Sequence, residues 1–298
     1  MAVIESFLGN DKLKKEVKNL ILSERLPHGI VLQGDEGTGC GFFAKLLAAE
    51  YLNDGNNLVM RDIHPDCISV EGSGSSGEIS VQTVRDALFE ANKAAVMTEG
   101  RRVILIKNAE MLNQSSSNAL LKMLEEPPEG VIFILTVKKD TDLLPTIISR
   151  SVIYRIHSPG VDMCSEEIMN RIPGCTKEKA DEISELFDGN VGLAIKALTD
   201  GTYSAMSLAG REFCKAALDR NRFAMIQWLS EADNREDLKV LMQSAVLWMK
   251  ANKNKSFDDA VFADRFIDEV SEAFEEAGKY TNIKIVETRL AYNLSENR

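Results

Sequence analysis

Short, continuous apolar runs constrain the fold of this chain more than any other feature of its sequence. Strands of a parallel sheet that helices cover on both faces are apolar throughout, whereas half-exposed strands alternate between apolar and polar residues. Four such runs occupy residues 29–33, 103–106, 131–136 and 152–156. Helical stretches over 10–25 and 42–52 flank the first run. The pattern predicts an α/β fold, in which helices cover both faces of a parallel sheet.

The pattern changes after Ser158-Pro159-Gly160, where strand signals nearly vanish. Three short helices are predicted at 164–171, 176–187 and 190–198, and longer helices over the rest of the chain. We therefore predict three domains. They are an α/β domain over residues 1–158, a small three-helix domain over 159–202 and an all-helical domain over 203–298.

The composition excludes several classes of protein. Of the 298 residues, 44% are apolar and 27% are charged, which is typical of a globular chain. The net charge of −11 argues against a free-standing DNA-binding protein, which usually carries a basic surface. No apolar stretch approaches the roughly 20 residues of a membrane helix, and the amino terminus lacks a signal-peptide pattern. The five cysteines form no CxxC pair, so we expect free thiols in a cytoplasmic protein without membrane contact.

A glycine-rich turn follows the first apolar run. Its sequence, GDEGTGCG, begins at Gly34 and places the second P-loop glycine at Gly39, with a strand before it and a helix after it. This is the context of the P-loop motif GxxxxGK[ST], whose lysine neutralises phosphates and whose hydroxyl binds Mg²⁺. Here Cys40 takes the lysine position and Gly41 the hydroxyl position. We predict a loop that keeps the shape without the chemistry; a simple glycine turn is the alternative.

The second half of a nucleotide site would follow the run at 103–106. An active P-loop ATPase has an acidic residue there to hold Mg²⁺. This chain has Lys107 and Asn108 instead, and we expect Glu110, on the next turn, at the surface. Because both halves of the site are altered, we expect no ATP hydrolysis.

A third motif lies between two of the apolar runs. Residues 117–128 read SNALLKMLEEPP, a helix stopped by a double proline, and Ser149-Arg150-Ser151 precedes the last run. This succession resembles the bacterial clamp-loader branch of the AAA+ ATPases, whose signature is NALLKxLEEPP, a polar residue ending the next strand, and Ser-Arg-Cys. Thr136 matches the polar, first sensor position, and a serine replaces the cysteine. The resemblance covers about residues 1–200; residues 203–298 match only in being helical and of suitable length.

The resemblance implies a P-loop domain over 1–158, a helical lid over 159–202 and a helical collar over 203–298. Within the family, the altered nucleotide site is similar to that of the non-hydrolysing member and not to that of the motor subunit. Gly192 agrees, because it stands where the motor has a phosphate-sensing arginine. Many relatives carry a four-cysteine zinc module, but residues 51–66 contain no cysteine, so we expect no zinc and a structural role for His64. No cofactor is expected.

The resemblance further implies that Arg150 is an arginine finger, which would enter the ATP site of a neighbouring motor subunit. The residues expected at the subunit interface are Ser149, Ser151, Asn118, Lys122, Glu125 and Glu126. The residues that could touch DNA phosphates are Arg85, Lys93, Arg101 and Arg102. The implied partners are the motor (gamma/tau) and delta subunits of the loader and, through the complex, the sliding clamp and primer–template DNA.

Alternatives stay open on the sequence alone. Arg150 could be a surface arginine paired with a nearby acid, and the exposed helix residues could serve only for solvation. The chain could be the active motor ATPase, although Cys40, Gly41 and Lys107 argue against it. It could also be a scaffold or regulatory pseudo-ATPase of the AAA+ class outside the clamp loader.

Overall fold

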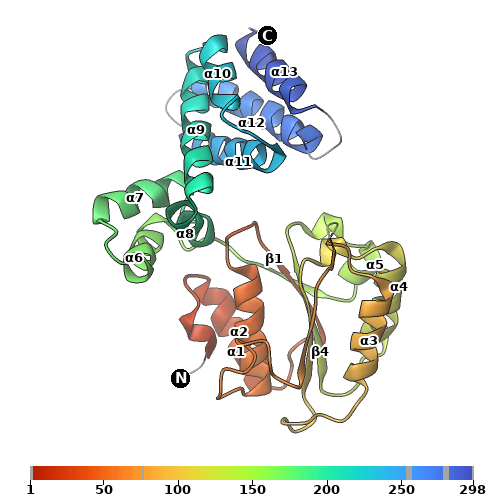
Figure 1. The fold of residues 1–298 in the computed structure, drawn as a ribbon. Coiled ribbons are helices and arrows are strands. Elements are labelled where there is room, and N and C mark those ends of the chain that lie inside the picture. Colours follow the sequence, from red (N-terminus) through yellow and green to blue (C-terminus); the bar gives the residue numbers. More distant parts are fainter. Residues whose placement is uncertain (1–2, 75–76, 253–256, 278–281, 297–298) are drawn as a thin grey trace. The chain divides into compact units, whose positions relative to one another are not determined.

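The computed structural model describes residues 3–74, 77–252, 257–277 and 282–296. The chain divides into two units, Met1–Ser158 and Pro159–Arg298 (Figure 1). Each unit is described below by itself.

The first unit is built on a five-stranded sheet with the order β2-β3-β4-β1-β5, in which every pair of neighbours is parallel. Its strands are β1 Gly29–Gln33, β2 Cys67–Val70, β3 Arg102–Ile106, β4 Val131–Val137 and β5 Val152–Arg155. All residues of β3 and β4 are buried, as the continuous apolar runs predict. The predicted α/β fold with a parallel sheet is confirmed.

Helices cover both faces of this sheet. The helices of the unit are α1 Asp11–Leu22, α2 Cys40–Leu52, α3 Val81–Ala91, α4 Gln114–Glu125 and the short α5 Pro145–Ile148. In Figure 1, α1 and α2 lie on one side of the strands, and α3, α4 and α5 lie on the other. Alternate residues of one strand feed the two cores: Ile30 and Leu32 pack under α2, whereas Val31 packs with Leu120 of α4.

Three elements of this unit escaped the sequence analysis, namely β2, α3 and the short α5. The strand β2 has four residues at the edge of the sheet, and only Val70 among them is buried. Such a short, half-exposed strand gives no continuous apolar run. Helix α3 begins at a cap in which the Ser80 hydroxyl accepts a hydrogen bond from the backbone N–H of Thr83 (3.1 Å).

The second unit consists of helices in its described part. They are α6 Val161–Arg171, α7 Lys177–Leu186, α8 Val191–Thr199, α9 Gly201–Leu218, α10 Arg222–Leu229, α11 Arg235–Asn252, α12 Phe257–Ala277 and α13 Ile283–Ser295. One apolar cluster joins α6, α7 and α8 with Tyr203, and another joins Phe213 with α10 to α13. Helix α9 therefore serves both clusters, and a boundary between lid and collar near residue 203 stays a prediction.

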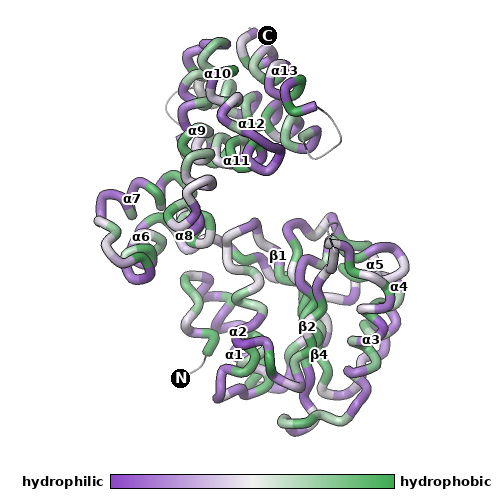
Figure 2. Tube along the Cα trace, in the orientation of Figure 1, coloured by the Kyte–Doolittle hydropathy of each residue, from purple (hydrophilic) through white to green (hydrophobic). Residues whose placement is uncertain are grey.

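Hydropathy follows the burial of each element. Apolar residues concentrate on the strands, and polar residues mark the outward side of the helices (Figure 2). Within the described ranges, no helix combines the length and the apolar character needed to cross a membrane.

Candidate functional site

The glycine-rich loop between β1 and α2 is held by a hydrogen bond to β4 and by another within the loop. The Gly34 N–H donates to the carbonyl of Val137 (3.0 Å), and the Thr38 hydroxyl donates to the carbonyl of Asp35 (2.7 Å). Gly39 has a φ of 86°, and a Cβ there would lie 3.0 Å from the Phe7 ring. A side chain at this position would be strained and crowded, so the turn into α2 requires glycine.

Cys40, at the lysine position of the motif, carries no charge. Its thiol donates to the carbonyl of Leu32 (Sγ to O, 3.1 Å). Burial raises the pKa of this thiol to about 12, and the negative charge of Glu110 adds to the rise. A hydrogen bond with the backbone of Val137 acts in the opposite direction and lowers the pKa. The lysine of α2, Lys45, forms an ion pair with Asp62 (2.6 Å).

Gly41, at the hydroxyl position, offers Mg²⁺ no side-chain ligand. A Cβ there would meet no atom within 4 Å, so the backbone leaves room for a larger residue. The loop accordingly lacks both the phosphate-binding lysine and the metal-binding hydroxyl of the P-loop motif. The missing hydroxyl is not due to lack of space, because the surroundings of Gly41 are open.

After β3, Lys107 stands where an active P-loop ATPase has a metal-binding acidic residue. The Lys107 ammonium lies 3.1 Å from a Glu71 carboxylate oxygen and 3.9 Å from one of Asp62. Asn108 adopts a left-handed conformation (φ 50°), and its backbone N–H donates to the Thr136 hydroxyl (3.0 Å). Thr136, the first sensor position, thus stabilises the turn after β3.

Glu110 is less exposed than the surface position expected from the sequence. The residue is only partly exposed, and its Oε2 atom is buried without a hydrogen-bond partner among the described residues. The short helix after β3 (Ala109–Met111) holds Glu110, and the negative charge of Glu110 adds to the rise in the pKa of the Cys40 thiol.

Arg150 lies at the corner between α5 and β5. Its Nη1 donates to the carbonyl of Thr146 (3.1 Å) and to the Ser149 hydroxyl (3.0 Å). Its Nη2 lies 2.8 Å from Oε1 of Glu125, at the end of α4. The Ser151 hydroxyl donates to the carbonyl of Ile147 (2.9 Å) and closes the turn. The structure thus brings together four of the residues predicted from the third motif.

The rest of that set lies on the exposed face of α4. The Asn113 side chain caps the start of this helix by accepting the Ser116 N–H (2.8 Å), and Pro127 follows its end. Helical spacing places Asn118, Lys122 and Glu125 along one face, and all three are exposed. Glu126 is exposed as well.

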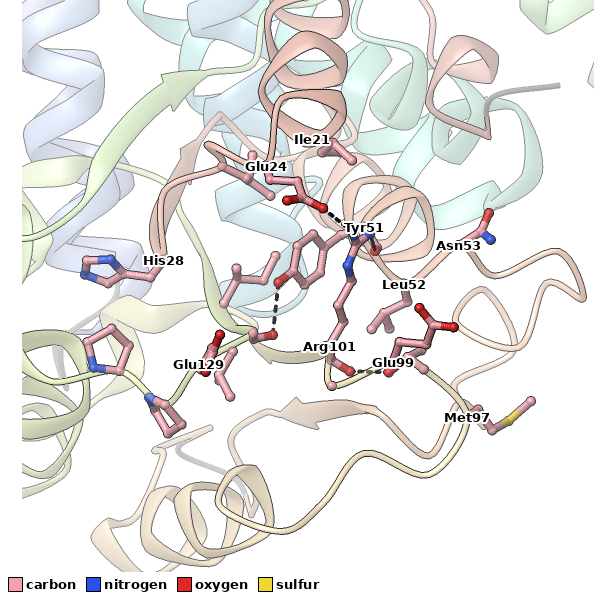
Figure 3. Close-up of a pocket in the computed structure, with 18 residues that line it drawn as sticks. Ile21, Glu24, His28, Tyr51, Leu52, Asn53, Met97, Glu99, Arg101 and Glu129 are labelled. Carbon is pink, nitrogen blue, oxygen red and sulfur yellow. Dashed lines mark hydrogen bonds and ion pairs between the residues drawn. The ribbon is translucent and has the colours of Figure 1, made fainter.

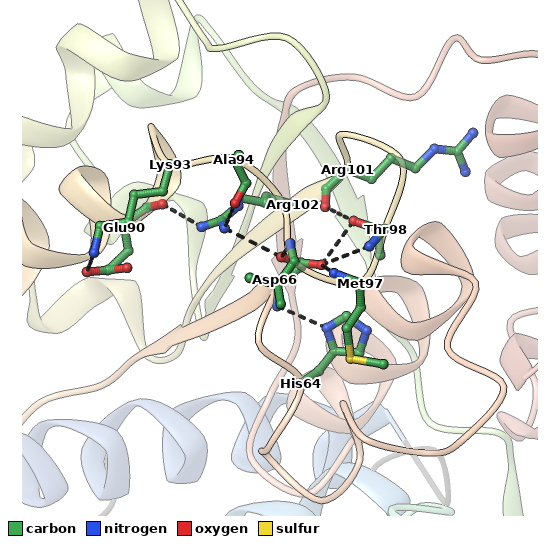
Figure 4. A network of polar contacts seen from close by, with 10 residues as sticks. His64, Asp66, Glu90, Lys93, Ala94, Met97, Thr98, Arg101 and Arg102 are labelled. Atoms are coloured by element: carbon green, nitrogen blue, oxygen red, sulfur yellow. Dashed lines mark hydrogen bonds and ion pairs between the residues drawn. The ribbon is translucent and has the colours of Figure 1, made fainter.

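The residues predicted to touch DNA phosphates have different environments. Arg102 is 4% exposed, and its guanidinium donates to the carbonyls of Glu90 and Ala94 and lies 3.5 Å from Asp66 (Figure 4). The prediction is therefore wrong for Arg102, which serves the core. Arg85 is exposed on α3, and Lys93 is paired with Glu90.

Arg101, the fourth of these residues, lines a cavity of about 1080 Å³ (Figure 3). It pairs with Glu24 (3.6 Å), and its guanidinium lies 5.4 Å from the centre of the Tyr51 ring. The cavity opens beside Arg101 and Gly130, which precede β3 and β4. The cavity therefore lies at the amino-terminal ends of the parallel strands, whereas the glycine-rich loop lies at their carboxyl-terminal ends.

A buried carboxylate that the sequence did not single out organises the segment before β3. Asp66 is fully buried and accepts the backbone N–H group of Val96 (2.7 Å). It also accepts those of Met97 (2.8 Å) and Thr98 (3.1 Å), which Figure 4 labels. Burial alone would raise the pKa of Asp66, but these hydrogen bonds outweigh it and hold the pKa below its usual value. The only sequence signal was the motif His64-Pro65-Asp66 before a strand.

His64 lies next to Asp66, in the region where many relatives of the resembled family carry a zinc module. The Nδ1 atom of His64 accepts the backbone N–H of Asp66 (3.1 Å), which is a structural role. Across the described part of the chain, no group of three or more His, Cys, Asp or Glu side chains is arranged to hold a metal ion.

The five-stranded parallel sheet, with a glycine-rich loop after its first strand and helices on both faces, defines the AAA+ class of P-loop folds. Two solved structures from Thermotoga maritima support this class: a protein related to the gamma subunit of DNA polymerase III and a point mutant of RuvB. The first has a TM-score of 0.54 at 17% identity and covers 94% of this chain and 98% of its own. The second has a TM-score of 0.50 at 14% identity and covers 97% of this chain and 85% of its own.

The family model described as DNA polymerase III, delta subunit, matches residues 9–160, and the chain belongs to this family. A DNA polymerase III subunit delta′ of Pseudomonas aeruginosa is 30% identical over 175 residues, which are 55% of this chain and 53% of that protein. The tau subunit of Bacillus subtilis is 26% identical over 216 residues, which are 68% of this chain and 36% of that protein. The chain spans about half the length, or less, of these curated relatives. The resemblance drawn from the sequence is confirmed.

Proposed function

We propose that this chain is the non-hydrolysing, delta-prime-type subunit of a bacterial clamp loader, and that it donates Arg150 to the ATP site of a neighbouring motor subunit. One observation carries the proposal. The chain's own nucleotide loop has lost its charge at Cys40, while the Arg150 corner keeps a partly exposed guanidinium.

The first half of the proposal is that this subunit does not hydrolyse ATP. A neutral thiol cannot offset the charge of a triphosphate, and Gly41 offers no oxygen to Mg²⁺. Lys107 adds a positive charge where the metal would bind and is already paired with Glu71. Gly192, in place of the phosphate-sensing arginine of the motor, agrees. We therefore propose that the subunit works without a nucleotide cofactor and without zinc.

The second half concerns Arg150. A guanidinium is permanently charged and forms forked hydrogen bonds to phosphate oxygens. Its three contacts with described residues occupy three of the five guanidinium N–H donors. An arginine finger supplied in trans accelerates GTP hydrolysis by about 10³ to 10⁵ in other systems. Ser149 and Ser151 shape the corner, and Asn118, Lys122, Glu125 and Glu126 would lie beside the neighbour.

The partners follow from the same proposal. They are the motor (gamma/tau) and delta subunits and, through the complex, the sliding clamp and primer–template DNA in the cytoplasm. Arg85, Lys93 and Arg101 stay candidates for phosphate contacts, because their side chains are not buried in the core as that of Arg102 is.

The second candidate is an active motor ATPase, which the similarity to the tau subunit of Bacillus subtilis favours. Calorimetric titration of the isolated full chain with ATP and Mg²⁺ separates the two, with a motor subunit as the positive control. We expect no saturable binding by this chain up to about 1 mM, the upper end of ordinary KM values. Magnesium-dependent binding with a micromolar Kd would favour the motor ATPase instead.

A further inference from the structure

We propose that Glu125 is a placeholder for phosphate at Arg150: its carboxylate holds the guanidinium in the unassembled subunit and is displaced by the neighbour's nucleotide on assembly. This inference rests on the proposed role of Arg150 as an arginine finger. It assigns a separate function to the last residue of α4.

The contacts of Arg150 are of two kinds. The carbonyl of Thr146 and the hydroxyl of Ser149 are neutral, and both accept from Nη1. Glu125 is the one anion paired with Arg150 among the described residues, and it lies on Nη2 (2.8 Å). The two neutral contacts fix the position of the guanidinium plane, whereas the carboxylate occupies an edge that a phosphate could use. Carboxylate and phosphate oxygens match the guanidinium fork in the same way, so they compete.

The position of Glu125 in its helix gives a second argument. Glu125 is the last residue of α4, and Glu126 follows directly. A negative charge at the carboxyl end of a helix meets the negative end of the helix dipole, which is unfavourable. Helix stability therefore does not explain a carboxylate at this position. The ion pair with Arg150 offsets the repulsion while the pair is intact.

The exposure of the pair makes it displaceable. The side chains of Arg150 and Glu125 are 36% and 50% exposed. Exposed ion pairs shift an equilibrium by about fivefold or less, and salt weakens them further. A multiply charged phosphate in a water-poor interface competes well against such a pair. The carboxylate can thus hold the guanidinium in place without preventing assembly.

The first test measures the pair in the isolated full chain. Phenylglyoxal modification of Arg150 is followed by peptide mass spectrometry in the wild type, in Glu125→Gln and in the matched control Glu129→Gln, which makes the same change at an exposed position four residues on. We expect Glu125→Gln to speed the modification about two- to fivefold and to remove its dependence on salt. Glu129→Gln should behave as the wild type. Equal rates in all three proteins would overturn the inference.

The second test uses the complex reconstituted with motor and delta subunits. Removal of a competing anion should lower the ATP concentration for half-maximal turnover by up to about fivefold, with kcat unchanged, in Glu125→Gln only. A lower kcat, or an unchanged half-saturating concentration despite faster modification, would overturn the placeholder role. Arg150→Ala is measured beside them: a loss of turnover there keeps the finger proposal, so the two failures are distinguishable. Unchanged turnover in Arg150→Ala would overturn both.

Discussion

At the scale of single residues, Asp66 joins β2 to the segment that precedes β3. Its carboxylate accepts three backbone N–H groups and the Thr98 hydroxyl (3.1 Å), all at a fully buried position. In Asp66→Asn, the amide can accept at one oxygen only, and its NH₂ group would face other donors. We expect the free energy of unfolding to fall by about 3 kcal/mol, measured by urea denaturation at pH 7. A loss below about 0.5 kcal/mol would contradict a structural role for this network.

The same carboxylate predicts a dependence of stability on pH. The hydrogen bonds hold the pKa of folded Asp66 below the ordinary value of 3.8, although burial acts in the opposite direction. Its contribution is therefore complete above that ordinary value and is lost as the pH falls through the lower folded pKa. We expect wild-type stability to drop between about pH 4 and pH 2 more steeply than that of Asp66→Asn. Parallel curves for the two proteins would rule out this linkage.

At the scale of elements, Gly29 is where β1, the end of α4 and the Arg150 corner meet. A Cβ at Gly29 would lie 2.7 Å from the Arg150 carbonyl oxygen and 3.3 Å from Leu124 Cδ2. The backbone of the corner must therefore move in Gly29→Ala, and we expect a loss of about 1 to 3 kcal/mol in unfolding free energy. Gly55→Ala, where a Cβ would meet nothing within 4 Å, is the control. Equal stability of the two variants would show that the corner is not tightly packed against β1.

Local sequence predicted the strands that consist of continuous apolar runs. The runs that became β1, β3 and β4 are buried, and the double proline ended α4 as expected. The edge strand β5 was predicted although it is mostly exposed, because Val152, Ile153 and Tyr154 are consecutive apolar residues. The strand β2 could not be predicted in the same way, because Ser69 interrupts the apolar residues of this four-residue strand. The burial of Arg102 depends on Asp66 and on two carbonyls from the preceding segment, which no local pattern reveals.

In the candidate site as well, single-residue features could be predicted from the sequence, whereas contacts between elements could not. The missing lysine and hydroxyl of the loop are single-residue facts, so the sequence alone predicted Cys40 and Gly41 as departures. The ion pair between Glu125 and Arg150 depends on how α4 packs against α5, so the sequence predicted both residues without their contact. The same holds for Glu110, whose Oε2 atom is buried.

At the scale of the whole molecule, the proposed function combines an altered glycine-rich loop with an arginine that would act in a neighbouring subunit. Its net charge of −11 agrees with a subunit that meets DNA only as part of a larger assembly. Under the proposed function, Arg150 acts only when a neighbouring subunit brings a nucleotide to it. The role of Arg150 is therefore tested in the assembled complex and not in the isolated chain.

The most direct measurement is DNA- and clamp-stimulated ATP turnover in the complex reconstituted with motor and delta subunits. It compares the wild-type chain with Arg150→Ala and with Arg61→Ala, a matched control at an exposed arginine of the same unit, after equal assembly is verified. We predict that Arg150→Ala slows hydrolysis at the neighbouring site by about 10³ or more, with assembly intact. Arg61→Ala should match the wild type. Unchanged turnover in a fully assembled Arg150→Ala complex would contradict the account.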